Sequence, residues 1–306
     1  MFALTILGSN SAIPAYGRNP TAQVLQTHEQ NILIDCGEGT QMQLARHKIK
    51  RSRINRIFIS HLHGDHYFGL IGLLTSMDLM SRTQPLHLHA PAELENIINI
   101  HLKASSTVMG YPLHFHPLPA DGCIVDEPSI RVDCFPVNHR IACWGFIFSE
   151  KKKPRKVIPE RAKAFEIPPL FYEQLQRGKD YVTAKGTIIP NAEVTEAARP
   201  PRRYAYCADT LYDESLVDIV RGVDLLYHET TYLKNQEEKA SQRFHSTTVQ
   251  AATIAKKAEV GQLVIGHFSG KYEHLEPFLE EASAIFPNTI LSLEGSCIQV
   301  RQDKDA

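Results

Sequence analysis

Short apolar runs rich in β-branched residues recur along the chain, and they predict the strands of its core. The predicted strands are residues 3–7, 31–35, 56–60, 86–90, 130–135, 144–148, 203–208, 224–228, 263–267 and 289–293. Because the strands first cluster and later alternate with helical segments, the pattern favours an α/β sandwich over an all-β domain.

Helical segments are predicted between these strands. They are residues 38–48, 66–80, 91–102, 213–221, 246–258 and 274–285. The segment 246–258 begins with Ser246, Thr247 and Thr248, whose hydroxyls are favoured at a helix N-cap, and it continues through alanines and lysines.

Residues from about 150 to 200 break this rhythm. The segment contains a lysine run and several prolines, with little periodicity. We expect an inserted arm that projects from the core, within a single domain covering residues 1–306.

Composition limits the cellular setting more than it limits the function. The chain has 306 residues, 43% hydrophobic and 22% charged, and a formal net charge of −1, which is an ordinary globular balance. Its 6 cysteines show neither CxxC pairs nor the spacing of a disulfide framework. We expect neither a signal peptide nor a membrane span, because the first ten residues lack the charged flank of a signal peptide and no stretch approaches the roughly 20 apolar residues of a span. We therefore expect a cytoplasmic protein with no membrane partner.

The positive charge is distributed unevenly despite this balance. Basic runs occur at 46–56, 151–156 and 199–203. A single run of this kind is as often a solvated surface as a binding site.

Candidate metal ligands follow the predicted strands at the points where the strands end. They are His61, His63, Asp65, His66, His139, Asp209, His228, Glu229 and His267. Since α/β folds gather functional groups where strands end at one edge of a sheet, we expect these side chains to share a site.

The segment 61–66, HLHGDH, is the most specific of these signals. His61 and His63 lie two residues apart, so in an extended backbone both rings point to the same side. Gly64 permits a sharp turn, after which the next two ligands begin a helix. One segment can thus present two pairs of ligands to adjacent cations. Imidazole and carboxylate without Cys suit Zn²⁺ and tolerate Mn²⁺ or Fe.

The other histidines lack such a pattern. His87 and His89 have the same spacing, but no acidic residue follows them, so we interpret them as one face of a strand. The remaining ones are His28, His47, His101, His114, His116 and His274, which we expect at ordinary surface or core positions.

HLHGDH is the signature of the metallo-β-lactamase superfamily, and further motifs resemble the ribonuclease Z family, the tRNA 3′-processing endonucleases, in its short bacterial form. They are IDCGEGTQMQL (34–44), YHETTY (227–232), FHSTTVQAATIAKKA (244–258) and LVIGHFSGKY (263–272). The resemblance covers nearly the whole chain. It implies an αββα sandwich, in which two packed mixed sheets are flanked by helices.

By this resemblance each subunit of a homodimer would bind two zinc ions. The first would be held by His61, His63 and His139, the second by Asp65, His66 and His267, with Asp209 bridging both. A metal-bound hydroxide would attack the phosphodiester of precursor tRNA while Asp65 accepts a proton. His245 would protonate the leaving 3′-oxygen, and Glu229 would orient His245. The products would be a tRNA with a 3′-OH and a trailer with a 5′-phosphate. His228 would be structural.

The family's arm grips tRNA, and the segment 150–200 stands where that arm is inserted. Two segments depart from the family pattern. Residues 167–178 lack the arm's Tyr-Gly-Lys core, and residues 11–22 keep only Pro14, Arg18 and Asn19 of a loop that shapes the site entrance.

Two alternatives remain open at this point. One is a metallohydrolase of small phosphodiesters, lactones or thioesters on the same scaffold, which the arm-like insertion and the motifs at 228–231 and 245–247 disfavour. The other is a non-catalytic relic of the superfamily, which would be expected to have lost a ligand, whereas this sequence retains every one.

Overall fold

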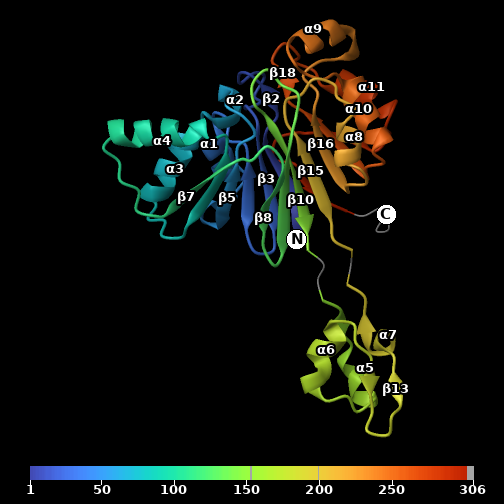
Figure 1. The fold of residues 1–306 in the computed structure, drawn as a ribbon. Helices are drawn as coiled ribbons and strands as arrows, with labels where there is room; N and C mark the ends of the chain where they lie inside the picture. The colour runs from blue at the N-terminus through green and yellow to red at the C-terminus, as the bar shows by residue number, and fades with distance from the viewer. Residues whose placement is uncertain (152–153, 199, 302–306) are drawn as a thin grey trace. The chain divides into compact units, whose positions relative to one another are not determined.

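The structure is a computed structural model, and it describes residues 1–151, 154–198 and 200–301 (Figure 1). The chain divides into two compact units. The larger unit comprises Met1–Val125, Val132–Phe148 and the described residues from Arg202 onward, and the smaller unit comprises Asp126–Arg131 and Ser149–Pro201.

The first large sheet is mixed. Its strands, in spatial order, are β20 (Cys297–Gln299), β1 (Phe2–Gly8), β3 (Ala22–Thr27), β4 (Asn31–Ile34), β5 (Ile54–Phe58), β6 (Leu86–Ala90) and β7 (Leu113–Pro117). Pairing is antiparallel from β20 to β4 and parallel from β4 to β7. The parallel strands β4 and β5 therefore bring Asp35 and the segment 61–66 to the same edge.

The second large sheet brings the C-terminal motifs together. Its strands, in spatial order, are β19 (Thr289–Leu291), β17 (Gln262–Gly266), β16 (Leu225–Glu229), β15 (Arg203–Cys207), β10 (Trp144–Glu150), β9 (Ile130–Pro136) and β8 (Gly122–Asp126). Strands β15, β16, β17 and β19 are parallel. The residues that follow β15, β16 and β17 consequently emerge at one edge.

The two sheets pack face to face through aromatic side chains. The ring centroid of Phe58 lies 5.3 Å from those of both Phe146 and Phe148. Helices cover the outer faces, where separate apolar clusters join each sheet to its helices. Figure 1 shows α1, α3 and α4 on one side of the sandwich and α8, α10 and α11 on the other. The predicted αββα layers are confirmed.

The helices of the larger unit lie near the predicted segments and most are shorter, but one of them, Glu237–Gln242, falls outside every predicted helix. They are α1 (Thr40–Arg46), α2 (Gly64–Tyr67), α3 (Leu70–Leu79), α4 (Glu93–Ala104), α8 (Leu216–Ile219), α9 (Glu237–Gln242), α10 (Thr248–Lys257) and α11 (Glu276–Ser283). The helix predicted at 66–80 is divided near Gly69, where a Cβ would lie 2.2 Å from the carbonyl oxygen of Gly37. Helix α10 is capped by Thr247, in a capping box with Gln250.

The smaller unit has a core of its own. Its elements are β11 (Lys156–Val157), α5 (Pro159–Ala164), η2 (Pro169–Phe171), α6 (Tyr172–Gln176), β12 (Tyr181–Val182), β13 (Ile188–Ile189), α7 (Asn191–Val194) and β14 (Thr195–Glu196). Buried Val157, Leu175 and Val194 belong to its apolar cluster. The Asn191 side chain donates to the carbonyl oxygens of Leu175 and Lys179 over 2.8 and 2.9 Å. Although the sequence predicts little periodicity here, these contacts order short elements.

Two of the basic runs fall partly beyond the described chain, because Lys152, Lys153 and Arg199 lie outside the described residues. Across the described residues, every helix is too short or too polar to pass through a membrane.

Candidate metal centre and active site

The predicted ligands converge at the edge of the sandwich to which the parallel strands lead. His61 and His63 follow β5, Asp65 and His66 lie on α2, His139 lies between β9 and β10, Asp209 follows β15, and His267 follows β17. His267 has a left-handed backbone (φ 62°), which is uncommon outside glycine and occurs most often where surrounding contacts impose it.

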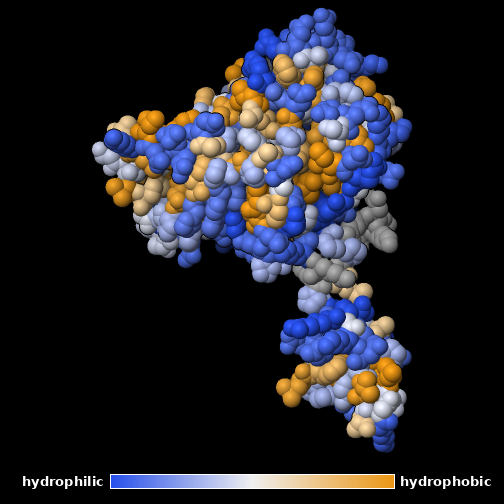
Figure 2. Space-filling view, in the orientation of Figure 1, coloured by the Kyte–Doolittle hydropathy of each residue, from blue (hydrophilic) through white to orange (hydrophobic). Residues whose placement is uncertain are grey.

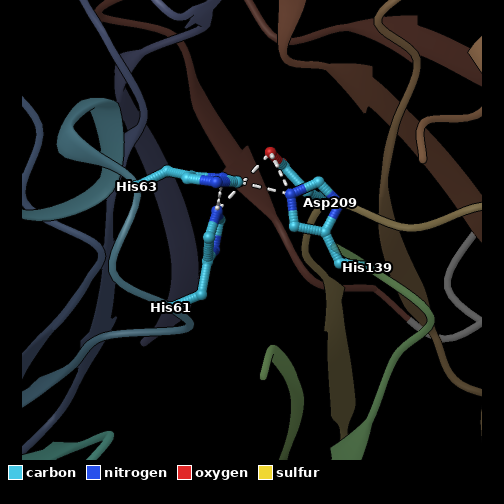
Figure 3. Close-up of side chains that lie close together, drawn as sticks. All are labelled: His61, His63, His139 and Asp209. Carbon is cyan, nitrogen blue, oxygen red and sulfur yellow. Dashed lines mark hydrogen bonds and ion pairs between the residues drawn. The ribbon is translucent and has the colours of Figure 1, made fainter. Parts of the chain in front are cut away.

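The first cluster consists of His61, His63, His139 and Asp209 (Figure 3). Nδ1 of His63 lies 3.0 Å from Nε2 of His61 and 3.1 Å from Nε2 of His139. Oδ2 of Asp209 lies 3.7 and 4.0 Å from the same two Nε2 atoms. Nitrogen ligands about 2.0–2.1 Å from one tetrahedral Zn²⁺ lie roughly 3.3 Å apart, so this spacing suits a metal.

The protonation of the first cluster also favours metal binding. Burial, followed by the neighbouring His66, holds the pKa of His61 well below its ordinary value. Burial likewise lowers the pKa of His63 and of His139. These rings are therefore neutral near pH 7, which is the form that binds a metal.

The second cluster consists of Asp65, His66 and His267. Nε2 of His66 lies 3.3 Å from Nε2 of His267, which in turn lies 3.3 Å from Oδ2 of Asp65. Burial opposes the charged form of His66, but the carboxylates of Asp209, Asp65 and Asp35 raise its pKa well above the ordinary value. The same carboxylates favour any positive charge bound at this cluster.

Asp209 faces both clusters, one with each carboxylate oxygen. Its Oδ2 faces the first cluster, and its Oδ1 lies 3.4 Å from Nε2 of His66 and 3.2 Å from Nε2 of His267. The side chain is buried. Buried imidazoles and carboxylates that converge on shared points are a donor set suited to divalent metal ions. The residues present therefore fit a pair of metals.

Hydrogen bonds behind the clusters fix which ring nitrogen each histidine presents. Nδ1 of His139 bonds the carbonyl oxygen of Phe244 over 2.9 Å, and Nδ1 of His66 bonds Oδ2 of Asp35 over 2.7 Å. In both histidines Nε2 is left to face the other ligands.

Asp35 is the most heavily used of these supporting residues. Its buried carboxylate also accepts the backbone N–H of Ser60 over 2.7 Å, the Ser60 hydroxyl over 2.9 Å and the Tyr206 hydroxyl over 2.6 Å. The Ser60 hydroxyl lies 3.0 Å from Nδ1 of His61, so Asp35 is linked to the first cluster indirectly, through that serine.

His245 and Glu229 form a pair beside both clusters. Nδ1 of His245 lies 3.1 Å from Oε1 of Glu229, and this carboxylate also accepts the N–H groups of Thr210, Thr231 and Ser246. Burial lowers the pKa of His245, but Glu229 more than offsets this and raises it to about 9. His245 can therefore hold a proton, and Glu229 fixes its ring.

The geometry permits a second role for His245. Together with Asp209 and His267 it forms a further group whose ligand atoms are close enough to share a metal ion. His228, in contrast, belongs to none of the ligand groups in the described chain. It is buried, and its Nδ1 bonds the carbonyl oxygen of Glu229 over 2.8 Å.

A cavity of about 660 Å³ opens onto the clusters, and its wall includes Asp65, Asp209 and His245. Three exposed basic residues also line it, namely Arg140, Arg243 and Lys271. Within the described chain no carboxylate forms an ion pair with any of the three. The cavity therefore combines a metal-ligand floor with a cationic rim suited to a polyanion.

The segment 11–22 forms part of the wall. The N–H of Ala12 donates to Oδ2 of Asp65 over 2.7 Å. Arg18 donates to the carbonyl oxygens of Tyr272 and Glu273, and Asn19 donates to the carboxylate of Glu294. Although this segment differs from the family pattern, its retained Arg18 and Asn19 anchor it beside the site.

Sequence reasoning did not single out Asp35, Thr231, Phe68 or Arg140 as site residues. Asp35 ends a predicted strand and could have been found by the rule that identified the ligands. Thr231 lies in the motif YHETTY, Phe68 lies two residues beyond HLHGDH, and Arg140 follows a predicted ligand. Each therefore adjoins a recognised signal, but only the fold shows that these side chains line the cavity.

A family model matches only the N-terminal part of the chain, whereas known relatives match nearly all of it. A family model described as "Anti-Pycsar protein Apyc1" matches residues 2–116, which is less than half of the chain. The ribonuclease Z of Bacteroides thetaiotaomicron is 43% identical over 306 residues, covering 99% of this chain and 97% of the relative. That of Cytophaga hutchinsonii is 46% identical over 308 residues, covering 98% and 96%.

Solved structures agree with these relatives. The human tRNase Z, short form, superposes with a TM-score of 0.73 at 27% identity, covering 98% of this chain and all of that one. YhfI of Bacillus subtilis, a metallo-β-lactamase-fold protein, gives 0.69 at 16% identity, covering 97% and 98%, and supports the fold alone. Given identities above 40% over nearly its whole length, the protein belongs to the ribonuclease Z family, the tRNA-processing endonucleases of metallo-β-lactamase fold.

Proposed function

We propose that this chain removes the 3′ trailer from precursor tRNA by metal-dependent hydrolysis of one phosphodiester bond. The observation that carries the proposal is the convergence of both ligand clusters and the His245–Glu229 pair on one cavity with a basic rim. The products are a tRNA ending in a 3′-OH and a trailer with a 5′-phosphate.

The metals of the proposal are two zinc ions. His61, His63 and His139 would hold one, Asp65, His66 and His267 the other, and Asp209 both. When bound, the ions would activate a water molecule and neutralise the phosphoryl oxygens. The imidazole-rich ligand sets and the separate oxygens that Asp209 offers to each cluster support this assignment.

Residues of this chain then accept and donate the protons of the reaction. Asp65 is fixed by the N–H of Ala12 and lines the cavity, so its carboxylate is available as an acceptor. His245 reaches the same cavity with one ring nitrogen held by Glu229, and its other nitrogen donates a proton to the leaving 3′-oxygen. Glu229 keeps the ring oriented throughout.

Substrate binding is assigned to two regions. The rim residues Arg140, Arg243 and Lys271 contact phosphates near the cleaved bond. The smaller unit, Ser149–Pro201 with Asp126–Arg131, is the inserted arm and contacts the tRNA body. Its separate core supports this role, because a segment that contacts the substrate as an independent unit needs a stable fold of its own. The homodimer, the cytoplasmic location and the arm rest on the family resemblance.

The test is the cleavage of a precursor tRNA with a labelled 3′ trailer, with zinc, with a chelator, and with Asp65→Ala. We expect one cut next to the acceptor end, a 3′-OH on the tRNA, and no cut in the latter two reactions. An intact trailer in the presence of zinc, together with rapid hydrolysis of a small phosphodiester or a lactone, would contradict the proposal.

A second test concerns the arm. Replacing Ser149–Pro201 by a short Gly/Ser linker should greatly weaken cleavage of precursor tRNA but preserve hydrolysis of bis(p-nitrophenyl) phosphate. Equal loss of both activities would mean that the segment supports the fold. Light scattering on the intact protein tests the homodimer.

A further inference from the structure

We propose that the exposed ring of Phe68 is a stacking platform for an unpaired nucleobase next to the cleaved phosphodiester bond. The inference deepens the proposed function and rests on it. It begins from a surface feature that the ligand clusters do not explain. Phe68 is 68% exposed, yet it lines the same cavity as His63 and Asp65. An aromatic ring that is exposed in a cavity beside ionic groups is accessible to a ligand, and its apolar surface can be buried against one.

The ring of Phe68 is held in place although it is exposed. It ends α2 and lies directly over Gly64, where a Cβ would come within 2.1 Å of a ring carbon. The ring centroid of Tyr67 lies 5.1 Å away at an interplanar angle of 65°. The platform is thus formed before a ligand arrives, which reduces the entropy lost on binding.

The residues around Phe68 indicate which ligand would bind to its ring. Arg140, Arg243 and Lys271 line the cavity and attract phosphates, while Phe68 offers an apolar, aromatic surface on the same wall. A nucleotide has both features, a charged backbone and a π face. Single-stranded nucleic acids are commonly bound by this combination of cations and stacking aromatic residues, which tolerates any base. An unpaired nucleotide flanking the cleaved bond matches both surfaces.

The experiment is a single-turnover cleavage assay with the full-length protein, zinc and precursor tRNA. The substrates carry either a normal base or an abasic site at each nucleotide flanking the cut. The variants are Phe68→Ala, Phe68→Leu and Phe68→Tyr. Leu79→Ala is the matched control, because Leu79 is 85% exposed and lies outside the cavity wall. Circular dichroism and light scattering monitor folding and oligomeric state.

We expect Phe68→Ala to raise the half-saturating concentration about tenfold, the loss typical of removing one stacked base. Phe68→Tyr and Leu79→Ala should resemble the wild type, and Phe68→Leu should resemble Phe68→Ala because it keeps the apolar area but not the ring. At one flanking nucleotide, removal of the base should raise the half-saturating concentration of the wild type about tenfold. The same removal should leave the half-saturating concentration of Phe68→Ala unchanged, because the stacking contact is already lost.

Three results would overturn the inference. The first is a half-saturating concentration for Phe68→Leu equal to that of the wild type. The second is an equal rise on base removal in the wild type and in Phe68→Ala. The third is a rise in Phe68→Ala that accompanies a change in oligomeric state. The last would assign Phe68 to a contact between copies of the chain. If the wild type leaves precursor tRNA uncut, the proposed function itself fails and takes this inference with it.

Discussion

The two ligand clusters use the same residue types but are supported in different ways. The first has three imidazoles and one carboxylate, and its His63 is half-buried. The second has two buried histidines, and behind it Asp35 bonds His66 directly. Burial keeps the first set of rings neutral, whereas carboxylates hold a proton on His66.

The difference shows how one sequence motif can serve two sites. HLHGDH supplies His61 and His63 to the first cluster and Asp65 and His66 to the second. Each pair combines one fully buried histidine, His61 or His66, with one partly exposed residue that lines the cavity. The supporting hydrogen bonds then come from other strands: the Phe244 carbonyl supports His139, and Asp35 supports His66. We therefore expect the second cluster to depend more strongly on residues that never touch the metal.

The largest effect is predicted for Asp209→Ala, which removes the side chain that the clusters share. Cleavage of precursor tRNA should fall to background and metal should be lost from both clusters, because each cluster loses a carboxylate oxygen. In the structure these oxygens lie 3.7 Å from Nε2 of His61 and 3.2 Å from Nε2 of His267. Inductively coupled plasma mass spectrometry and a cleavage assay measure this. The control Asp218→Ala, at an exposed carboxylate, should change neither the cleavage rate nor the metal content. Retention of both metals would show that Asp209 does not bridge the clusters.

His245→Ala decides whether this residue belongs to the second cluster. As a proton donor, its loss should slow cleavage of precursor tRNA by about 10²–10⁴-fold and leave the metal content unchanged. Bis(p-nitrophenyl) phosphate should be far less affected, because its leaving group needs no proton. His101→Ala, on the outer helix α4, is the control. A fall in bound metal would instead make His245 a ligand, as its position near Asp209 and His267 allows.

Asp35→Asn tests the unequal support of the clusters. Asn tolerates the left-handed backbone of this position (φ 54°), so the fold should persist. We expect metal affinity at the second cluster to fall about 10- to 100-fold, and that at the first to change less. Competition with a chromophoric chelator measures both. Asp78→Asn, at a half-buried carboxylate that belongs to neither cluster, is the control. Equal losses at both clusters would show that the relay through Ser60 matters as much as the direct bond.

Thr231→Val should have the smallest effect. The hydroxyl of Thr231 donates to Glu229 over 2.8 Å and accepts from Nδ1 of His267 over 2.9 Å. The backbone N–H of Thr231 still bonds Glu229 in the variant, so we expect activity to drop about tenfold or less. Steady-state cleavage rates measure the drop, with Thr231→Ser as the conservative control. Loss as large as that of His245→Ala would place Thr231 among the catalytic groups.

The convergence of the candidate ligands was predictable because most of them follow strands with an apolar segment. The same strands, such as β4 (NILI) and β17 (QLVIG), indicated an α/β sandwich, whereas the αββα layer order was implied by the family resemblance. The missed elements lack that contrast: β3 (AQVLQT) and β7 (LHFHP) mix polar residues into strands, and α9 (EEKASQ) has no apolar face. Their structure is decided by neighbours that are remote in sequence.

The smaller unit illustrates the same limit. Its elements are only a few residues long, so no period develops, and its order depends on Leu175, Asn191 and their contacts. The cavity wall could be predicted only in part. Phe68, Arg140 and Lys271 each lie within four residues of a predicted ligand, but the local sequence does not show that their side chains line one cavity.

The most direct measurement is a metal titration of the metal-free protein, with native mass spectrometry and cleavage of precursor tRNA followed on the same samples. The account predicts that two zinc ions bind per chain and that cleavage follows the doubly loaded species. Full cleavage at one zinc per chain, with no gain from the second, would contradict it.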